Sequence, residues 1–552
     1  MKRILLSFMF TLMLAGLAFA QRTVSGTVTS ADDGSTIPGV NVVLKGTTTG
    51  ATTDLDGNYR LSVPEDGGIL VFSFIGLTQQ EVTIGARSVI DVAMESDVQQ
   101  LTEVVVTGAA PGITTKTLGY SLGKVDESLI QQAPGVDPAQ ALQGKVAGVK
   151  VIQNGAPGSN AGIRLRGSTS LYEGQQPLII VDGVIVDGGL NTINSEDIES
   201  MEILKSSSAA ALYGSRGANG VIVINTRRGS NVKEGDVRIV FRNEVGRNYL
   251  PGRIDLAETH HYEIDPETGA PPVGNQVPRA DALSIVPYPN AKDYQDILFT
   301  EDVFYTNYLS ISGRTDKANF MLSAQNTKQP GVVYGTDGQS RQNFKANFDY
   351  NLTDDLFIST SNFFSQREID NAPTSVFFDA LLFRPDLDLF QMVPNPNNPS
   401  EMVINAKPDS SQQMVNPVYT LTERYSTTKD DRYIGSVGLN YSPFNFVTLE
   451  GFVGLDKRWS NTENVVPLGY LADDVAFQRI GAGGMDVTKW QSSQINVRGN
   501  ILFSKTFGDL ALNSRFGYWF ERNIYDYTQI NGDGFTFDRR TLENIQNISD
   551  VD

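Results

Sequence analysis

The chain has 552 residues, 40% of them hydrophobic, and a formal net charge of −19. Its length has room for more than one domain, and its charge argues against a nucleic-acid partner, whose phosphates would be repelled. It contains no cysteine and only two histidines, which excludes disulfides, thiol catalysis and thiolate metal sites. The counts of 52 Gly, 28 Phe and 20 Tyr are typical of an all-β protein with many turns and aromatic girdles.

The first 20 residues have the three parts of a secretory signal peptide. Lys2 and Arg3 form the positive start, residues 4–18 the apolar core, and residues 18–20 (Ala-Phe-Ala) the cleavage site. The apolar core has about 15 residues, fewer than the ~20 that span a bilayer as a helix, and no later stretch is long enough. A part of this chain that crosses a membrane would therefore have to be a β-barrel.

Residues 22–95 contain short alternating runs that turn residues separate every 8–12 positions, a pattern that predicts a small β-sandwich. The stretches 38–42 (PGVNV), 45–47 (KGT) and 53–57 (TDLDG) resemble the carboxypeptidase regulatory-like fold. The signature of a zinc carboxypeptidase is missing from the sequence. The resemblance therefore implies a binding or spacer module rather than a peptidase.

The stretch Leu101–Gly108 (LTEVVVTG) is a β-prone apolar run with polar segments on both sides. It can be a linker strand that pairs within its own domain. It can also be an unpaired strand to which a partner protein adds a strand through main-chain hydrogen bonds. The run alone does not separate these two interpretations.

Residues 118–228 mix helical and strand patterns. A helix is predicted to begin after Asp137, with Ala139, Leu142 and Val146 on one face, and several short strands follow. Glycines at three-residue spacing from 214 to 220 suggest a phosphate loop. That interpretation is weak, because no Gly-Lys-Ser/Thr follows and the next predicted element is a strand rather than a helix.

Several stretches between residues 237 and 525 alternate between apolar and polar residues. In residues 343–350, for example, every second residue is Phe, Ala or Tyr, and the residues between them are Asn, Lys or Asp. This pattern is typical of outer-membrane strands with lipid on one side and water on the other, although a soluble sandwich could also produce it. About nine strands are predicted, at 237–247, 303–313, 318–326, 342–351, 356–367, 432–441, 446–459, 489–504 and 509–525.

The connections between these strands alternate between short turns and long loops, as the turns and loops of bacterial barrels do. The ninth strand would run from the periplasmic side to the outer side of the barrel, so the chain would end in an outer loop at Asp552. A single-chain bacterial barrel has an even number of strands and both termini in the periplasm. We therefore expect residues 229–552 to be the first part of an incomplete barrel.

The run 191–228, together with segments 141–149 (ALQGKVAGV) and 177–184 (PLIIVDGV), resembles the plug domain of SusC/RagA-type TonB-dependent outer-membrane transporters. The resemblance extends back through the regulatory-like domain. It implies a mainly β chain with a small N-terminal β-sandwich, a mixed α/β plug and an antiparallel transmembrane barrel of the 22-strand type. The implied boundaries are 1–20 (signal peptide), 22–95 (sandwich), 96–117 (linker), 118–228 (plug) and 229–552 (barrel).

The resemblance also assigns roles. The 101–108 stretch would be the TonB box, which pairs as an added strand with TonB through the residues Thr102, Glu103, Val104, Val105, Val106 and Thr107. The implied partners are the TonB complex, a SusD-like lipoprotein, outer-membrane lipid and a cargo of oligosaccharide or peptide. The N-terminal domain and TonB box would be periplasmic and the long loops extracellular.

Two further sets of residues are candidates. Arg164 and Arg166 are suited to bidentate carboxylate contacts, and we expect them to latch the plug to the barrel wall through Glu450 or another inward carboxylate. Aromatic platforms for sugar stacking are expected among the residues Tyr294, Phe304, Phe377, Phe378 and Tyr425.

No catalytic constellation, cofactor or metal site is expected, so an enzyme is the least favoured class. Two other functions remain open. One is a siderophore or cobalamin receptor of the same broad type, and the other is a non-transporting surface structural protein or adhesin. A neighbouring gene for a SusD-like lipoprotein would favour the nutrient importer, and an adhesin would leave the 101–108 stretch unexplained.

Overall fold

The computed structural model describes residues 21–551 except 32–33, 48, 65–66, 75–78, 95–103, 106–112, 115–121, 132–136, 154, 168–175, 206–208, 210–212, 257–258, 262–284, 288–290, 372–375, 384, 409–414, 472–480, 508–509 and 538–539. The predicted signal peptide lies outside the described residues. The chain divides into two compact units, residues 1–106 with 112–119 and residues 107–111 with 120–552. No helix in the described part of the chain is long and apolar enough to cross a membrane.

The first unit contains two small sheets that share one apolar core. One sheet has the order β4-β1-β7 and the other β3-β2-β5-β6. Their strands are β1 (Gln21–Ser30), β2 (Asn41–Leu44), β3 (Gly50–Thr52), β4 (Asn58–Pro64), β5 (Ile69–Ser73), β6 (Gln80–Thr83) and β7 (Val92–Met94). Alternate residues of β4 are buried, as a half-buried strand requires, and both sheets contribute side chains to the core.

The linker after this sandwich contains a two-residue hairpin. Strand β8 (Val104–Val105) pairs antiparallel with β9 (Ile113–Thr114). The other proposed TonB-box residues lie outside the described part of the chain. Two paired residues on each side make a weak ladder, because an isolated two-stranded hairpin is at best marginally stable in water.

The second unit begins with a five-stranded sheet of mixed direction, in which β13 and β16 are parallel and the other pairs are antiparallel. Its order is β10 (Leu122–Asp126), β15 (Ile198–Leu204), β16 (Val221–Thr226), β13 (Leu178–Val181) and β14 (Val184–Val186). A ribbon of β11 (Val149–Ile152) and β12 (Gly162–Leu165) and the short helices α2 (Glu127–Gln131) and η2 (Pro138–Leu142) complete this plug domain.

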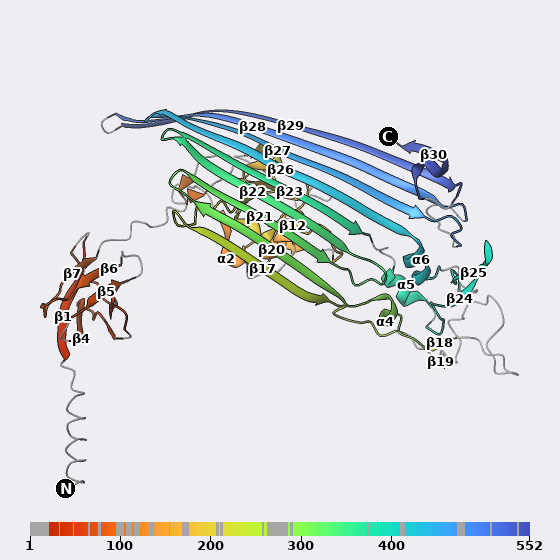
Figure 1. The fold of residues 1–552 in the computed structure, drawn as a ribbon, viewed down its shortest axis with the longest axis horizontal. Coiled ribbons are helices and arrows are strands. Elements are labelled where there is room, and N and C mark those ends of the chain that lie inside the picture. Colours follow the sequence, from red (N-terminus) through yellow and green to blue (C-terminus); the bar gives the residue numbers. More distant parts are fainter. Residues whose placement is uncertain are drawn as a thin grey trace, which may run out of the picture. The chain divides into compact units, whose positions relative to one another are not determined.

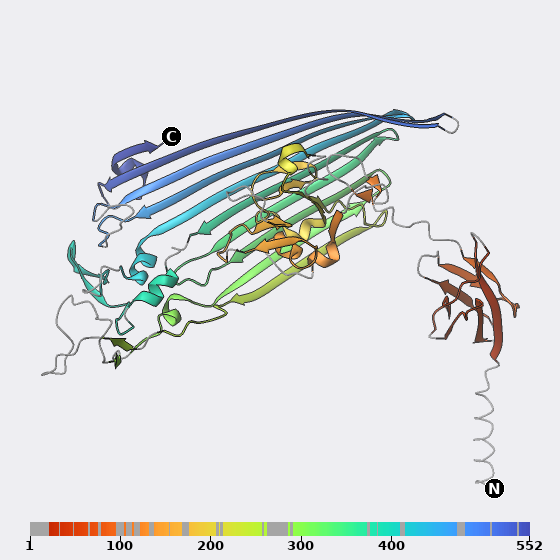
Figure 2. The same cartoon turned by 180° about the vertical axis from the view of Figure 1, so that it is seen from behind.

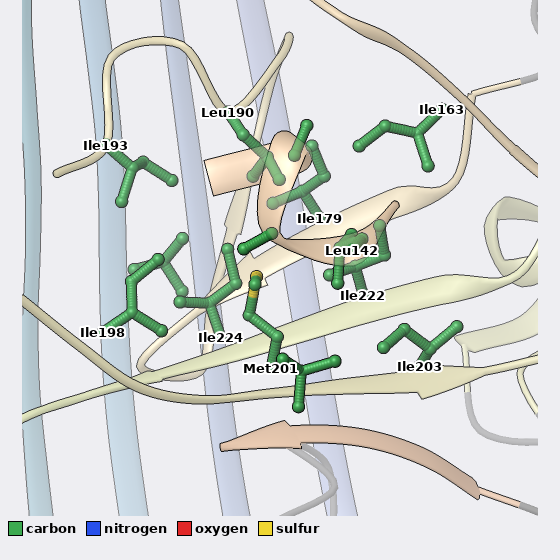
Figure 3. Close-up of a cluster of buried hydrophobic side chains, with 14 of the residues drawn as sticks. Leu142, Ile163, Ile179, Leu190, Ile193, Ile198, Met201, Ile203, Ile222 and Ile224 are labelled. Atoms are coloured by element: carbon green, nitrogen blue, oxygen red, sulfur yellow. The ribbon is translucent and has the colours of Figure 1, made fainter. Parts of the chain in front are cut away.

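The helix predicted after Asp137 is present but short. It is a 3-10 helix of five residues, and the Asp137 carboxylate caps it by accepting a hydrogen bond of 2.9 Å from the Ala139 N–H. Ala139, Leu142 and Val146, predicted to share one face of the helix, are all buried, although Val146 lies beyond the end of the helix. Their partners are the apolar side chains of the five-stranded sheet, among them Ile179, Met201, Ile203, Ile222 and Ile224 (Figure 3).

The rest of the second unit is one large antiparallel sheet (Figure 1). Its ten strands are, in order, β17 (Val237–Asn248), β20 (Asp302–Arg314), β21 (Ala318–Gln329), β22 (Gln339–Thr353), β23 (Leu356–Asp370), β26 (Tyr425–Phe444), β27 (Val447–Val466), β28 (Gly484–Phe507), β29 (Leu510–Phe535) and β30 (Ile545–Val551). Every strand pairs with its neighbours along this series, and β17 and β30 are the edges of the described sheet.

The expectation of about nine strands was wrong by one. The ninth strand continues to Phe535 and a tenth, β30, pairs with its end. Phe535 packs with Val465, Met485 and Val487, and Ile545 lies against this cluster. Because this small apolar core lies beyond the region where the alternation is strongest, the sequence pattern did not reveal that strand pairing continues there.

The connections alternate as predicted. Short turns join strands at one end of the sheet, which we call the short-turn end, and long connections gather at the other, the long-loop end (Figure 1). The long connections carry α4 (Gln295–Leu298), α5 (Val376–Leu382), α6 (Pro417–Glu423) and the hairpin of β24 (Met392–Asn395) and β25 (Asn398–Ile404). The three helices share an apolar cluster that includes Leu298, Ala380 and Val418, so these loops form a folded lobe.

Candidate functional site

The plug domain lies against one face of the large sheet, which we call the inner face (Figure 2). On β22 the residues of the inner face are polar, and the plug buries them. They are Arg341, Asn343, Lys345, Asn347 and Asp349. The residues between them point the other way, and Phe344 and Phe348 are 53% and 47% exposed. This sheet therefore reverses the usual arrangement of a soluble protein, because its polar face is buried and its apolar face is open.

Asp182 is the centre of the first plug contact. It lies with Gly183 in the tight turn between β13 and β14, and both residues have positive φ angles of 47° and 83°, which a two-residue hairpin turn of this kind requires. The turn presents the Asp182 carboxylate to the wall, where it accepts hydrogen bonds from Lys345 at 3.1 Å and Ser361 at 2.6 Å. Thr226 of the plug donates to it from both its N–H and its hydroxyl.

The surroundings of Asp182 favour its charged form. Burial raises the pKa of this carboxyl, but the positive charges of Lys345 and Arg228 and the hydrogen bonds from Ser361 and Thr226 outweigh burial, so that the pKa lies below its usual value. Asp182 is therefore a carboxylate at neutral pH. Both partners of the Asp182–Lys345 ion pair are buried, with side-chain exposures of 4% and 2%.

Asp197 makes a second contact with different electrostatics. It accepts hydrogen bonds from the Tyr308 hydroxyl at 2.9 Å and the Ser323 hydroxyl at 2.6 Å, both from the wall. Burial raises its pKa above the usual value, and these hydrogen bonds only partly oppose that effect. The preceding residue, Glu196, forms an ion pair of 2.6 Å with Arg242 of β17. The plug is thus held to β17, β20 and β21 as well as to β22.

Wall arginines hold the plug through its backbone. Arg432 is paired with Asp456 on the neighbouring strand at 2.7 Å and donates to the Asp187 carbonyl at 2.6 Å. Asp456 in turn accepts a hydrogen bond of 2.9 Å from the Asp187 N–H. Arg432 and Asp456 balance each other within the wall, and their contacts to the plug are made to the peptide group of Asp187 and to the Thr192 hydroxyl, which accepts from Arg432 at 3.1 Å.

The same design recurs around Asp430. This wall carboxylate is paired with Arg458 at 2.6 Å and with Arg367, and Arg367 donates to the Gly158 carbonyl at 2.8 Å. Arg341 donates to the Asn191 carbonyl. Three arginines therefore fix the plug loops at 158, 187 and 191, and buried charge-assisted hydrogen bonds of this kind are stronger than neutral ones.

Side-chain pairs complete the interface. Arg228, just after β16, forms an ion pair of 2.5 Å with Asp349, and Asn347 donates to the Thr226 hydroxyl at 3.0 Å. Further along the sheet, Arg216 of the plug pairs with Glu521 of β29. The plug–wall interface therefore reaches from β17 to β29. It combines these hydrogen bonds and ion pairs with an apolar contact, in which Phe363 and Ile434 of the wall join the buried core of the plug.

The residues predicted as a latch are not in this set. Arg164 and Arg166 are exposed, and neither forms an ion pair with a described wall carboxylate. Glu450 instead accepts a hydrogen bond of 2.9 Å from Asn500 on the neighbouring strand. The choice of arginine for plug–wall contacts was sound, but the arginines that make them, such as Arg228 and Arg432, are elsewhere in the chain. The alternation of the strands predicted which wall residues lie on the inner face, but it did not predict which plug residues they contact.

The predicted aromatic platforms have different environments. Tyr294 is completely buried in the helical lobe, and its hydroxyl donates to the Leu387 carbonyl at 2.9 Å, so it is a structural residue. Phe377 and Phe378 contact each other edge to face, and Phe304 is partly exposed at the start of β20. Tyr425 is 44% exposed and has the Arg540 guanidinium over its ring, 3.9 Å from the centroid.

An open-faced sheet with a polar inner wall and a small domain held against that wall defines the class of plugged outer-membrane β-barrel proteins. Comparison with known families agrees. Residues 114–221 match the TonB-dependent receptor plug domain, and residues 24–106 match the carboxypeptidase regulatory-like domain.

Curated relatives and solved structures are similar along most of the chain. TonB-dependent receptor P3 of Formosa agariphila is 30% identical over 93% of this chain and 49% of its own length. TonB-dependent receptor SusC of Bacteroides thetaiotaomicron is 35% identical over 59% of this chain and 33% of its own length. The RagAB peptide importer in its closed-closed state superposes with a TM-score of 0.63 at 19% identity, over 79% of this chain and 52% of that chain, a likeness that shows the fold.

The chain therefore belongs to the TonB-dependent receptors of the SusC/RagA type, as its motifs suggested. It spans about half the length, or less, of the curated relatives it matches.

Proposed function

We propose that this chain is part of a TonB-dependent importer that moves a nutrient, an oligosaccharide or a peptide, across the outer membrane. The observation that carries the proposal is the largely polar plug–wall interface. A plug held by an apolar interface would leave hydrophobic surface in a water-filled channel whenever it moved. A plug held by carboxylates, guanidinium groups and peptide groups can separate from the wall and be rehydrated.

Movement of such a plug needs a source of work. The outer membrane has no ATP, so energy has to come through a protein that reaches across the periplasm. We assign that contact to the TonB box, Thr102–Thr107, and above all to residues 103–106. A strand that TonB adds to this run and pulls along its axis loads several main-chain hydrogen bonds together. The pairing of Val104 and Val105 with Ile113 and Thr114 is short enough for TonB to replace.

The same proposal places the N-terminal sandwich and the TonB box in the periplasm and the long-loop end outside the cell. A SusD-like surface lipoprotein would cover that end and deliver the cargo. The helical lobe of α4, α5 and α6 offers a folded surface for this partner, because its apolar cluster fixes the long connections in one arrangement. No catalytic role is proposed for any residue.

The proposal is tested in cells that make the complete receptor. We expect the double substitution Val104→Pro and Val105→Pro to abolish energy-dependent uptake and to leave cargo binding unchanged, because proline removes the N–H groups that an added strand needs. The matched control is Val104→Ile with Val105→Ile, which keeps the strand propensity and should retain uptake.

Unchanged uptake in the proline variant would contradict TonB-driven import by this chain. The same experiment separates the other classes. A siderophore or cobalamin receptor would show the same proline effect with an iron chelate or corrinoid as the cargo. A surface structural protein or adhesin would show neither uptake nor an effect of the proline pair.

A further inference from the structure

The face of the large sheet that points away from the plug, its outer face, changes chemistry at one level. Strand pairing places one row of amide side chains there, across β17, β20, β21, β22 and β23. This amide row consists of Asn243, Asn307, Asn326, Gln342 and Gln366. The Asn243 amide donates to the side-chain oxygen of Asn307. These residues belong to the outer face because they alternate with inner-face residues, as Gln342 does with Arg341 and Asn343.

The outer face is apolar on the short-turn side of the amide row. The next paired residues in that direction are Phe241, Leu309, Ala324, Phe344 and Phe364. On β22 this apolar band continues to Leu352. Residues 344–352 rise about 30 Å along the strand, or about 23 Å along the membrane normal at a tilt of ~40°, close to the ~25 Å apolar band of outer-membrane barrels. The amide row therefore lies at the boundary between the hydrocarbon and the lipid headgroups.

A cavity of about 880 Å³ lies on the long-loop side of this boundary. The outer-face residues that line it are Lys328, Ser340, Glu368, Asp370, Tyr425 and Thr427. The first three form the next paired row beyond the amide row. Gly338 and Asn371 also line it, just past the ends of β22 and β23, and there it reaches Ser426 and Asn464 of the inner-face set. The cavity therefore begins on the lipid-facing side of the wall, at the depth of the lipid headgroups.

The charged groups of the cavity are held in exposed ion pairs. Lys328 is paired with Asp337 at 2.9 Å, with side-chain exposures of 38% and 85%. Glu368 lies 3.9 Å from Lys429 on the neighbouring strand, and Arg424 also lines the cavity. Exposed pairs of this kind contribute little to stability. The basic groups can therefore turn to a phosphate at a small cost.

The remaining lining suits a ligand with many hydroxyl groups. The hydroxyls of Thr336, Ser340 and Thr427 face the cavity, and each can both donate and accept a hydrogen bond. Tyr425 lines its long-loop end, where the Arg540 guanidinium lies 3.9 Å from the centroid of the ring and adds a further positive charge. A volume in this range is typical of sites that enclose an organic molecule rather than a single ion.

We infer that this cavity binds the headgroup of an outer-leaflet glycolipid of the lipid A type, an acylated and phosphorylated amino-sugar disaccharide. The acyl chains lie on the apolar band, and the amide row bonds to the ester and amide groups that join these chains to the sugars. The sugars fill the cavity, with a phosphate beside Lys328 and Arg424. A phospholipid is the less suitable ligand, because its headgroup is smaller than the cavity and offers fewer partners to the hydroxyls. The inference rests on the proposed orientation, which places the long-loop end outside the cell.

The test uses the purified complete receptor in phosphatidylcholine nanodiscs and measures lipid binding by native mass spectrometry. The probes are diphosphorylated lipid A, its dephosphorylated form and phosphatidylglycerol. We expect lipid A to bind most tightly and its dephosphorylated form several-fold more weakly. Phosphatidylglycerol, which has the negative charge without the sugars, should not displace lipid A.

Two variants address the cavity. Lys328→Ala with Arg424→Ala should weaken lipid A binding by roughly tenfold or more, because charge-assisted hydrogen bonds to phosphate are strong. Ser340→Trp fills the cavity from a position on the outer face and should weaken both forms of lipid A, even if the first variant fails to fold. The matched control is Arg247→Ala, which removes an exposed outer-face base outside the cavity, paired at 3.6 Å with Glu301, and should leave binding unchanged.

Four results would overturn the inference. They are no binding of lipid A, phosphatidylglycerol bound as tightly as lipid A, lipid A binding that neither cavity variant changes, and equal binding of lipid A with and without its phosphates. The last result would contradict the contact assigned to Lys328 and Arg424.

The Val104→Pro and Val105→Pro receptor separates this inference from the proposed function. It should bind lipid A as the parent receptor does. Uptake that survives the proline pair would contradict TonB-driven import and leave the lipid site standing. A receptor that imports its cargo but binds no lipid A would contradict the lipid site alone.

Discussion

The plug has two buried surfaces of opposite chemistry. Its interior is hydrocarbon, with Ile203, Ile222 and Ile224 completely buried between the sheet and η2 (Figure 3). Its contact with the wall is made largely of carboxylates, guanidinium groups and backbone carbonyls, such as Asp182 with Lys345 and Arg432 with Asp187. Phe363 and Ile434 of the wall add a smaller apolar part. The first surface keeps the domain folded, since exposing it costs about 25 cal/mol per Å². The second can open to water, so the domain can leave the wall without unfolding completely.

The strongest test of the polar plug–wall contact is to leave one of its buried charges without its partner. Lys345→Met removes the ammonium group from Asp182, and we expect the plug–wall contact to lose about 3–5 kcal/mol. Hydrogen exchange of the amides of β13 and β16, in the folded receptor, should rise accordingly. In the matched control, Lys345→Met with Asp182→Asn, the uncompensated charge is gone and part of the loss should be recovered. Unchanged exchange in the single variant would show that the pair contributes nothing.

The apolar surface should respond differently. Ile222→Val removes one methyl group from the core and should lower the free energy of unfolding of the plug by about 0.5–1.5 kcal/mol. The substitution leaves the polar contacts to the wall in place. Hydrogen exchange should therefore rise in β15 and β16, and it should not change in the 187–191 loop. The control is Ile239→Val on the outer face, where the side chain is 65% exposed, and hydrogen exchange of the plug should not change.

The N-terminal sandwich has an apolar core that contains one polar group, the hydroxyl of Tyr59. Its contribution to stability can be compared with that of the polar plug contacts. Tyr59 donates to the Ile90 carbonyl at 2.9 Å, and burial together with the nearby Asp91 carboxylate raises its pKa to about 12. Tyr59→Phe should cost about 1 kcal/mol at neutral pH in a denaturant titration of residues 21–95.

The pH dependence of the same sandwich follows from that pKa. The unfolded tyrosine loses its proton near pH 10, whereas the folded one holds it until about pH 12. Stability should therefore be constant below pH 10 and fall as the pH rises from about 10 to 12. This fall should be absent in Tyr59→Phe, and a phenylalanine variant with the same alkaline profile would contradict the assignment.

The smallest effect is expected at the two arginines first considered as a latch. Arg164 and Arg166 are exposed and have no described wall carboxylate as a partner. Reversing both charges, Arg164→Glu with Arg166→Glu, should change plug retention by no more than about 0.5 kcal/mol. Release of the plug from the wall in this variant, measured by protease access to the plug, would restore the latch hypothesis.

Local pattern was enough for much of the architecture. The alternation in 343–350 identified which side chains share a face, because successive residues of a strand point to opposite sides. The lengths of the connections identified the short-turn and long-loop ends. Strand ends were less certain, since β28 and β29 continue through a region where the Phe535 cluster, rather than alternation, keeps the strands paired.

The contacts of the site were beyond the sequence alone. Asp182 and Lys345 are 163 residues apart, and the Arg432–Asp187 contact spans 245. No local signal links such pairs, so the sequence did not single out Arg228 or Arg432 as the arginines of the described plug–wall contact.

By itself the sequence predicted export, and it determined that the protein is β-rich and built from a sandwich, a plug and strands with one polar and one apolar face. These properties depend on composition and on period-two alternation. Only the tertiary structure decided what the polar face is for. It brings the Asp182 turn, the Gly158 and Asp187 carbonyls and the wall arginines into register, and it folds the long connections around a cavity. Both depend on the register of ten paired strands, which shifts every side chain to the opposite face if it slips by one residue.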